Sequence, residues 1–290
     1  MFDLSPIRDI GQHEFIESHL ATNTPLVGRD CFTRTGPLAS PWSLEPLVEK
    51  FGSCRVPVFD TLFDMQRSVR FGDYASAITC EQSDEPVPYM RWYARQRHFQ
   101  MIRADEAFAE LANNWSAPSW VPTADYVFPA INKNADPVKQ SFPAKGFFVC
   151  AAGGRTRLHV DPWVSDAVLC QVTGEKRFVM YHPSAAESLM DGEAVVDPEQ
   201  PDDVRFPRWR SIHPAIDVTL SPGDAIYIPA GWFHAASALT PSVSITWNFI
   251  HEVNGDRFAA YLAASGFADP TVKYFHANPA AALHDGTSTS

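Results

Sequence analysis

The sequence predicts a mainly β protein with flanking helices. Between residues 146 and 250 the chain consists of short apolar segments separated by turn residues, such as Thr173-Gly174 and Pro222-Gly223-Asp224. Short strands at regular spacing are typical of a β-sandwich or barrel. Helical patterns lie before and after this region. A chain of 290 residues, 45% of them hydrophobic, can form one large domain with a sizeable core.

The N-terminal region predicts two helices and one strand. Residues 42–52 form an amphipathic helix that ends at a glycine, and residues 54–60 alternate as a strand does. Residues 103–115 predict a second helix with its apolar face inward. The proline-rich stretch 116–143 indicates loops and turns.

Seven apolar segments follow in the central region, and a helix comes after them. The strand segments are residues 146–152, 156–161, 167–174, 176–183, 217–229, 233–239 and 242–250. Residues 256–266 predict the helix. We therefore expect one structural domain with three regions: 1–145 packed on the core, 146–252 as the β core, and 253–290 as a helical extension with a frayed tail.

The overall charge and the termini narrow the class of protein. The formal net charge is −11, so the chain lacks the basic footprint of a nucleic-acid binder and does not favour anionic membranes. Its five cysteines form no CxxC pair, which indicates reduced thiols. We find no secretory signal and no apolar run long enough to span a bilayer. These features predict a cytoplasmic protein without a membrane anchor.

Three residues have the chemistry and spacing of metal ligands. His159 and Asp161, in "RTRLHVDPW", lie two positions apart on a predicted strand and therefore share a face. His234, in "IPAGWFHAAS", comes from a later strand and is flanked by apolar residues. Two histidines and one carboxylate are the ligand set of non-haem Fe(II) oxygenases, and zinc also accepts them. The ligand set alone leaves the metal open.

A lysine and a polar strand face predict the second half of the site. Lys176 opens the segment "KRFVMY", and a lysine inside a barrel needs an anion. Ser244, Thr246 and Asn248 line one face of "SVSITWNFI", which predicts a polar wall of an internal cavity. A dicarboxylate such as 2-oxoglutarate fits the charges, since its two carboxylates neutralise the Fe(II)-aspartate pair and the lysine.

The segments "TRLHVDP", "CQVTGEKRFVMYHP", "LSPGDAIYIPAGWFHAASAL" and "SVSITWNF" resemble the JmjC and cupin-like Fe(II)- and 2-oxoglutarate-dependent oxygenases. Among these they are most similar to the asparaginyl hydroxylases of the hypoxia response. The resemblance runs from Pro25 to Ile250, because "PWSLEPLVEKFG" and "VRFGDYASAI" also match. It implies a double-stranded β-helix of the jelly-roll or cupin type.

The resemblance also implies roles for individual residues. It places the iron on His159, Asp161 and His234. It assigns the C5 carboxylate of 2-oxoglutarate to Lys176 with help from Thr156. It puts Asn248 near the co-substrate, and it matches Tyr89 to a tyrosine that touches the co-substrate, with Tyr93 as a rival.

The sequence departs from the family at one position of the predicted site. Ala167 stands where many members have an asparagine, and the preceding loop "PWVSDA" is longer than theirs. Ser165 or Asp166 is a candidate to replace the missing hydrogen bond. An altered way of holding the co-substrate is the alternative.

These observations predict an Fe(II)- and 2-oxoglutarate-dependent dioxygenase, with O2 as the second co-substrate, that hydroxylates a small metabolite, an amino acid or a peptide side chain. The alternatives are a cupin enzyme that uses the metal without 2-oxoglutarate, a JmjC hydroxylase that modifies protein or tRNA, and a non-catalytic binding module. We expect a small-molecule or peptide substrate, no nucleic-acid partner and no membrane. A homodimer through the C-terminal helices is the one protein partnership we expect.

Overall fold

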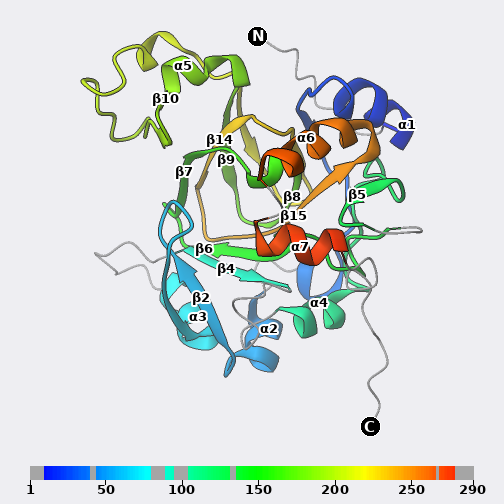
Figure 1. Cartoon of the computed structure of the whole chain (residues 1–290). Helices are drawn as coiled ribbons and strands as arrows, with labels where there is room; N and C mark the ends of the chain where they lie inside the picture. The colour runs from blue at the N-terminus through cyan, green and yellow to red at the C-terminus, as the bar shows by residue number, and fades with distance from the viewer. Residues whose placement is uncertain are drawn as a thin grey trace.

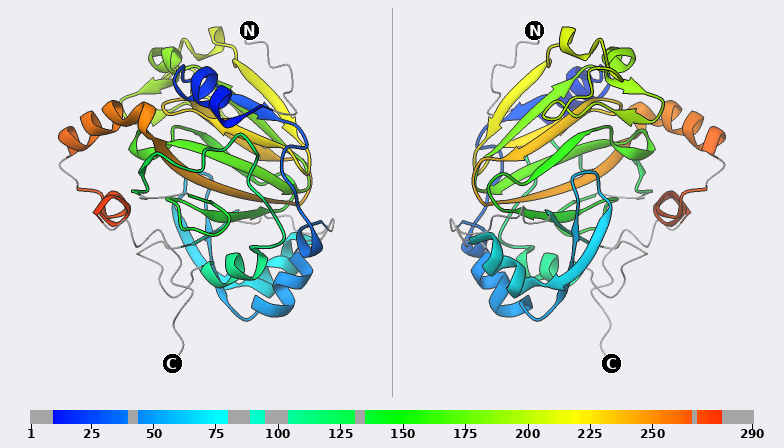
Figure 2. Two further views of the ribbon diagram at one scale, coloured as in Figure 1. Left: turned by 90° about the vertical axis from the view of Figure 1, so that its right-hand side faces the viewer. Right: turned by 90° about the vertical axis from the view of Figure 1, so that its left-hand side faces the viewer.

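The computed structural model describes residues 10–39, 44–79, 89–94, 104–130, 135–265 and 268–277. Within these residues the strands form a nine-stranded sheet, a four-stranded sheet and a two-stranded ribbon. The two larger sheets face each other, and the helices lie around their edges and outer surfaces (Figures 1 and 2). The expected division of the chain into three regions stays a prediction.

The larger sheet has the strand order β1-β13-β8-β15-β6-β4-β2-β3, and β5 pairs with β15. Its strands are β1 (Leu26–Gly28), β2 (Arg55–Phe59), β3 (Met65–Arg70), β4 (Tyr89–Tyr93), β5 (Tyr126–Phe128), β6 (Gly146–Cys150), β8 (Asp166–Thr173), β13 (Ala225–Ile228) and β15 (Ser242–His251). Strands from the N-terminal third thus extend the sheet beyond β6. This extension brings β4 beside the central region of the fold.

The smaller sheet has the strand order β12-β9-β14-β7. Its strands are β7 (Arg155–His159), β9 (Lys176–Tyr181), β12 (Ile216–Leu220) and β14 (Phe233–Ala238); the ribbon is β10 (Met190–Asp191) with β11 (Ala194–Val195). Along the chain, β7 to β9 and β12 to β15 alternate between the two sheets. Antiparallel strands that alternate in this way form a double-stranded β-helix, so the predicted fold class is confirmed.

Short helices lie around the sheets: most cover the ends and the outer face of the larger sheet, and α5 packs against the smaller one. They are α1 (Gln12–Phe15), which continues as a π-helical turn (Ile16–Leu20), α2 (Leu44–Phe51), α3 (Phe71–Thr79), α4 (Asp105–Leu111), α5 (Ala186–Leu189), α6 (Gly255–Ser265) and α7 (Pro270–Ala277). Helices α6 and α7 bury Phe258 and Phe275 against Phe128 of β5 and Ile250 of β15. The predicted frayed tail lies outside the described residues.

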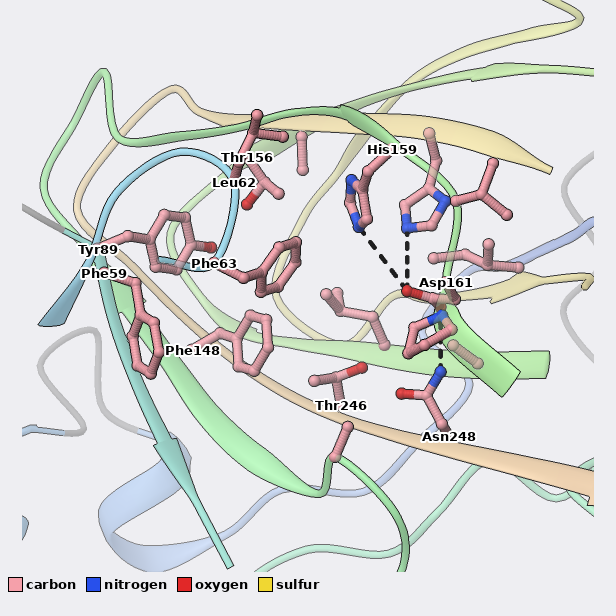
Figure 3. Close-up of a pocket in the computed structure, with 18 of the residues that line it drawn as sticks. Phe59, Leu62, Phe63, Tyr89, Phe148, Thr156, His159, Asp161, Thr246 and Asn248 are labelled. Atoms are coloured by element: carbon pink, nitrogen blue, oxygen red, sulfur yellow. Dashed lines mark hydrogen bonds and ion pairs between the residues drawn. The ribbon is translucent and has the colours of Figure 1, made fainter. Parts of the chain in front are cut away.

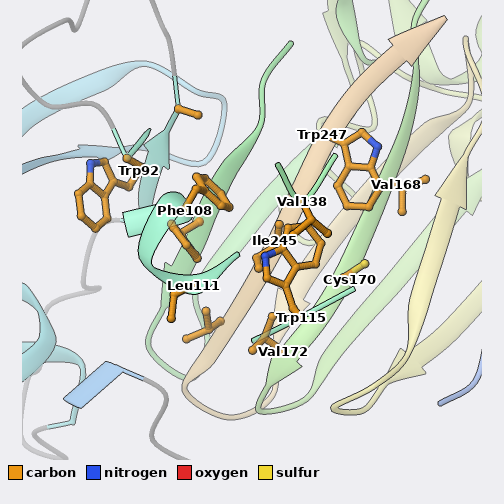
Figure 4. Close-up of a cluster of buried hydrophobic side chains, with 14 of the residues drawn as sticks. Trp92, Phe108, Leu111, Trp115, Val138, Val168, Cys170, Val172, Ile245 and Trp247 are labelled. Carbon is orange, nitrogen blue, oxygen red and sulfur yellow. The ribbon is translucent and has the colours of Figure 1, made fainter. Parts of the chain in front are cut away.

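The largest hydrophobic cluster lies on the outer face of the larger sheet. Ile245 and Trp247 of β15 and Val168 of β8 point to this face, where Trp115 and Phe108 cover them (Figure 4). The indole rings of Trp115 and Trp247 have their centroids 6.0 Å apart. Because side chains alternate along a strand, the polar residues of β15 must point the other way, into the space between the sheets.

The secondary structure differs from the sequence-based expectation at several places, and β1, β4, α1 and α3 were among the elements not predicted. The segment 217–229 is two strands, β12 and β13, because the turn after Leu220 sends the chain from one sheet to the other. The stretch 116–143, predicted as loops, contains the short strand β5. Strand β3 was not predicted, since an exposed edge strand needs no apolar alternation.

No helix of the described residues has the length and apolar character needed to cross a membrane. The four described cysteines, Cys31, Cys54, Cys150 and Cys170, are free thiols.

Candidate metal centre

The structure brings His159, Asp161 and His234 together at one point. His159 ends β7, Asp161 follows two residues later, and His234 on β14 is the register partner of His159. The Nε2 atoms of both histidines lie 3.7 Å from Asp161 Oδ1. One ligand atom from each residue lies within 4.8 Å of the other two (Figure 3). Three donors at this spacing can share one small cation.

Main-chain carbonyls fix the orientation of both imidazoles. His159 Nδ1 lies 2.8 Å from the carbonyl oxygen of Arg157, and His234 Nδ1 lies 3.1 Å from that of Trp232. A carbonyl can only accept, so each Nδ1 carries the proton and each Nε2 keeps its lone pair. Burial and the neighbouring His234 lower the pKa of His159 well below its usual value, which favours the neutral ring. A divalent metal binds neutral imidazoles, so the residues fit such an ion.

A hydrogen bond to Oδ2 fixes the orientation of the Asp161 carboxylate. The amide Nδ2 of Asn248, on β15, donates to Asp161 Oδ2 at 3.1 Å and to Ser165 Oγ at 2.9 Å. These bonds leave Asp161 Oδ1 directed toward the two histidines. Asn248 therefore positions a candidate ligand, a contact that sequence reasoning did not specify.

A cavity of about 430 Å³ opens beside these three residues. Its lining includes His159, Asp161 and His234 at one end and Tyr89 and Lys176 at the other. Aromatic side chains form much of the wall between the two ends (Figure 3). The volume falls within the range of small-molecule sites in proteins.

Lys176 is buried in this cavity, and its ammonium pairs with no carboxylate of the described residues. The side chain is 1% exposed, and its Nζ donates to Tyr89 Oη at 2.8 Å and to Ser244 Oγ at 2.6 Å. Burial lowers the pKa of Lys176 to about 8, and the nearby Arg91 charge adds to the effect. An ammonium among hydroxyls alone is costly to bury, so the geometry is suited to an incoming anion.

The other predicted co-substrate residues lie near Lys176 or along the same wall. Thr156 lines the cavity, and its hydroxyl oxygen accepts a hydrogen bond from Arg91 Nη2 at 3.0 Å. Tyr93 also lines the cavity but packs edge-on against Phe148, whereas Tyr89 touches Lys176. The roles of these residues toward a co-substrate stay predictions.

The region around Ala167 distinguishes the two candidates for the missing hydrogen bond. Ala167 lines the cavity and is the register partner of Asn248. Ser165 bonds to Asn248, while Asp166 points to the opposite face of β8 and accepts from Tyr227 Oη at 2.9 Å and from the backbone nitrogen of Ala230. Ser165 is thus the candidate that lies at the site.

Sequence reasoning did not single out two residues that border the site. Phe63, at the tip of the β2–β3 hairpin, packs edge-on against His159 with ring centroids 4.8 Å apart. Arg91 is fully buried on β4 behind Thr156. An arginine within the otherwise apolar run "PYMRWYA", two positions after Tyr89, was the available signal. No comparable signal marks Phe63, because its place depends on the docking of the hairpin.

Comparison with known proteins gives several relatives. Lysine-specific demethylase JMJ21 of Arabidopsis thaliana is 26% identical over 262 residues, which is 85% of this chain and 25% of that protein. The tRNA wybutosine-synthesizing protein 5 of Danio rerio is 26% identical over 246 residues, covering 78% and 70%. The 2-oxoglutarate and iron-dependent oxygenase JMJD4 of Gallus gallus is 20% identical over 271 residues, covering 87% and 60%.

The chain spans only a quarter of the length of JMJ21, so the likeness concerns a part of that protein. The profile of the family described as a cupin-like domain matches residues 12–255, which include both large sheets and the His-Asp-His cluster. Because that match takes in most of the sequence, the chain belongs to the family of cupin-like domains.

Proposed function

We propose that the protein is an iron(II)- and 2-oxoglutarate-dependent oxygenase that hydroxylates a small metabolite, an amino acid or a peptide side chain. The observation that carries this proposal is a buried cation, Lys176, in the same cavity as the His159, Asp161 and His234 cluster. A cupin that uses its metal alone has no need of that lysine.

The overall reaction accounts for both ends of the cavity. One oxygen atom of O2 enters a C–H bond of the substrate to give C–OH, and the other enters the succinate that 2-oxoglutarate becomes when it loses CO2. Ferrous iron held by the three ligands supplies the O2 chemistry that protein side chains lack. The protein supplies binding, orientation and exclusion of water.

The residues of the cavity divide these tasks. Lys176 is placed to pair with the C5 carboxylate of 2-oxoglutarate. Tyr89 accepts from Lys176, so its own hydroxyl proton can be donated to the same carboxylate in place of its hydrogen bond with Cys150. The Thr156 hydroxyl can likewise donate its proton to this carboxylate, since its oxygen accepts a hydrogen bond from Arg91. Phe59, Phe63 and other aromatic residues keep the wall between the two ends apolar.

The relatives support the class of reaction but differ in substrate. Their names describe a lysine demethylase, a tRNA-modifying protein and an oxygenase of unstated substrate. A net charge of −11 opposes a tRNA substrate, which would require neutralisation of phosphates. We therefore propose a small-molecule or peptide substrate and no nucleic-acid partner.

The proposal is tested by O2-dependent turnover of 2-oxoglutarate with Fe(II), followed as succinate release during a screen of metabolites and peptides. We expect turnover by the natural sequence and a loss of at least about 1,000-fold in His159→Ala and Asp161→Ala, because loss of one ligand leaves the ferrous site incomplete. The matched control is His213→Ala, which removes an exposed histidine. Its turnover should equal that of the natural sequence.

Two results would contradict the proposal. Turnover by the Asp161→Ala protein equal to that of the natural sequence would remove the metal cluster from the chemistry. Tight metal binding with no turnover and no affinity for 2-oxoglutarate would favour a cupin enzyme of another kind.

A further inference from the structure

Arg91 is a buried cation that the proposed reaction does not use. Its side chain is 0% exposed and comes from β4, two residues after Tyr89. Nη2 donates to Thr156 Oγ1 at 3.0 Å, and Nη1 donates to the carbonyl oxygen of Asp60 at 2.9 Å. The guanidinium carbon lies 4.0 Å from the ring centroid of Phe63 and 4.6 Å from that of Tyr89.

The guanidinium has hydrogen-bonding capacity left over. An arginine offers five N–H groups, and the structure engages one on Nη1 and one on Nη2. Arg91 Nε is buried without an acceptor among the described residues, and the two bonds that the guanidinium makes there are to a main-chain carbonyl and a hydroxyl, not to a carboxylate. The remaining N–H groups suffice for a two-pronged bond to one carboxylate.

Arg91 lies one layer behind the wall of the cavity and is not itself among the lining residues. Thr156, Phe63 and Tyr89, three of the groups it touches, all line that cavity. On the hairpin side the rings of Phe63 and Phe59 cover it, with centroids 4.0 Å and 5.6 Å from the guanidinium carbon, and Figure 3 shows the Phe63 ring between Tyr89 and His159. The hairpin tip is a surface feature, since the adjacent Leu62 is 41% exposed. Phe63 is the nearest of the covering rings, so a ligand in the cavity reaches Arg91 only when this ring moves aside.

The charges of the site leave room for one more anion. A ferrous ion with Asp161 carries one net positive charge, and Lys176 and Arg91 add one each. The two carboxylates of 2-oxoglutarate neutralise two of these three charges, so one positive charge stays buried beside the cavity. Such a charge costs several kcal/mol to bury without a partner. A substrate with one negative group would balance it.

We propose that Arg91 binds a carboxylate of the substrate, so that the oxygenase acts on an acid. This inference rests on the proposed function. The substrate class is a small organic acid, an amino acid or a peptide with a free carboxylate within reach of the metal. Lys176, with the Tyr89 and Thr156 hydroxyls, serves the co-substrate, and Arg91 serves the molecule that is hydroxylated.

The experiment compares each acid with its own amide. Amino acids, N-acetyl amino acids and short peptides are supplied as free acids and as the matching amides to the Mn(II)- and 2-oxoglutarate-loaded protein, and binding is measured by calorimetry. Succinate release with Fe(II) is measured on the same pairs. We expect at least one pair in which the acid binds about 30-fold more tightly than the amide. In Arg91→Gln we expect that ratio to fall below about 3.

The affinity of each variant for 2-oxoglutarate shows whether the mutated residue binds the carboxylate of the substrate or that of the co-substrate. Arg91→Gln should change it by less than about 3-fold, and that result also shows that the variant has kept its cavity. Lys176→Gln should weaken it by at least about 30-fold. Arg177→Gln is the matched control, since Arg177 lies on the same strand as Lys176 but pairs with Asp217 at the surface. Arg177→Gln should alter neither the preference for the acid over the amide nor the affinity for 2-oxoglutarate.

Each other outcome overturns the inference. If no acid in the panel binds better than its amide, the substrate carboxylate is excluded, and this arm needs no variant to fold. If Arg91→Gln keeps the acid preference, another residue provides it. If Arg91→Gln loses 2-oxoglutarate affinity as Lys176→Gln does, Arg91 serves the co-substrate. Failure of the proposed function itself differs from all three, because the protein would then bind no 2-oxoglutarate.

Discussion

The amide of Asn248 links the candidate metal ligands to the sheet behind them. It donates to Asp161 Oδ2 and to Ser165 Oγ, so it restrains both the carboxylate and the loop that follows β7. Trp163 and Val164 in this loop have positive φ angles of 63° and 49°. Non-glycine residues in that region cost energy, and such a loop needs external contacts to keep its shape.

We therefore predict that Asn248→Ala weakens metal binding by about 10- to 100-fold, the usual effect of removing a group that orients a ligand. Titration of the metal-free protein with Mn(II) measures this. Asn113→Ala, at an exposed position after α4, is the control and should bind Mn(II) as the natural sequence does. Equal affinity in both variants would show that Asp161 needs no support from Asn248.

We predict that Lys176 makes the binding of 2-oxoglutarate sensitive to pH. Burial, together with the nearby Arg91 charge, lowers its pKa to about 8 against an opposing effect of Cys150, and Tyr89 and Ser244 contact the ammonium directly. The charged form binds the carboxylate, and it is lost as the pH rises through the lowered pKa. Below about pH 7 the lysine is charged and affinity should be constant.

Above about pH 8 we predict that the dissociation constant for 2-oxoglutarate rises about tenfold per pH unit, because binding must then take up a proton. The measurement is calorimetry with Mn(II)-saturated protein at a series of pH values. Lys176→Arg keeps its charge throughout and should show a flat profile. A slope that persists in Lys176→Arg would assign the titration to another group.

The site residues differ in how well they could be predicted from the sequence. His159 and Asp161 were predictable because the period of a strand puts positions two apart on one face, and His234 because an imidazole between apolar residues needs a partner. Tyr89 was predicted with Tyr93 as a rival, and the contact with Lys176 separates them. Arg91 had a signal in its apolar surroundings that was not used, whereas Phe63 was not predictable, since its closeness to the site depends on how the β2–β3 hairpin packs against β7.

At the scale of elements, the turn between β8 and β9 sets the position of Lys176 at the start of its strand. Gly174 has a φ of 71° in this turn, and an added Cβ would lie 2.1 Å from the carbonyl oxygen of Pro241. Gly192, between β10 and β11, has a similar φ of 61° but open space around its Cα. Alanine substitutions at Gly192 and Gly174 therefore separate the energy cost of a left-handed backbone from the cost of a clash with the main chain.

We predict that Gly192→Ala lowers the free energy of unfolding by about 1–2 kcal/mol, the cost of left-handed backbone for alanine. Gly174→Ala should lower it by at least about 3 kcal/mol, since a clash with main chain adds to that cost. Urea denaturation of the two variants provides the comparison. Equal losses would mean that the turn relaxes without strain.

Elements were predicted best where burial sets their pattern. Strands β6 to β9 and β13 to β15 were found because their inward and outward residues alternate against a core. The edge strand β3 and the short β5 were missed because pairing with neighbours, rather than their own side chains, keeps them extended. The helix at residues 105–111 was recognised from an apolar face that does pack inward on the larger sheet.

At the scale of the whole molecule, the site depends on segments far apart in the sequence. β4 supplies Tyr89 and Arg91, β7 and β14 supply the histidines, and β15 supplies Asn248. A double-stranded β-helix brings such segments together because its strands alternate between facing sheets. The expected homodimer through α6 and α7 and the expected cytoplasmic location stay predictions, and sedimentation of the purified chain would test the first.

The central claim is that three side chains hold a ferrous ion which 2-oxoglutarate then chelates. The most direct measurement is an anaerobic titration of the Fe(II)-loaded protein with 2-oxoglutarate, followed by visible absorption. We predict a charge-transfer band that saturates at one 2-oxoglutarate per chain, is absent in Asp161→Ala, and needs higher 2-oxoglutarate in Lys176→Ala. Absence of the band in the natural sequence, or an unchanged band in Asp161→Ala, would contradict the account.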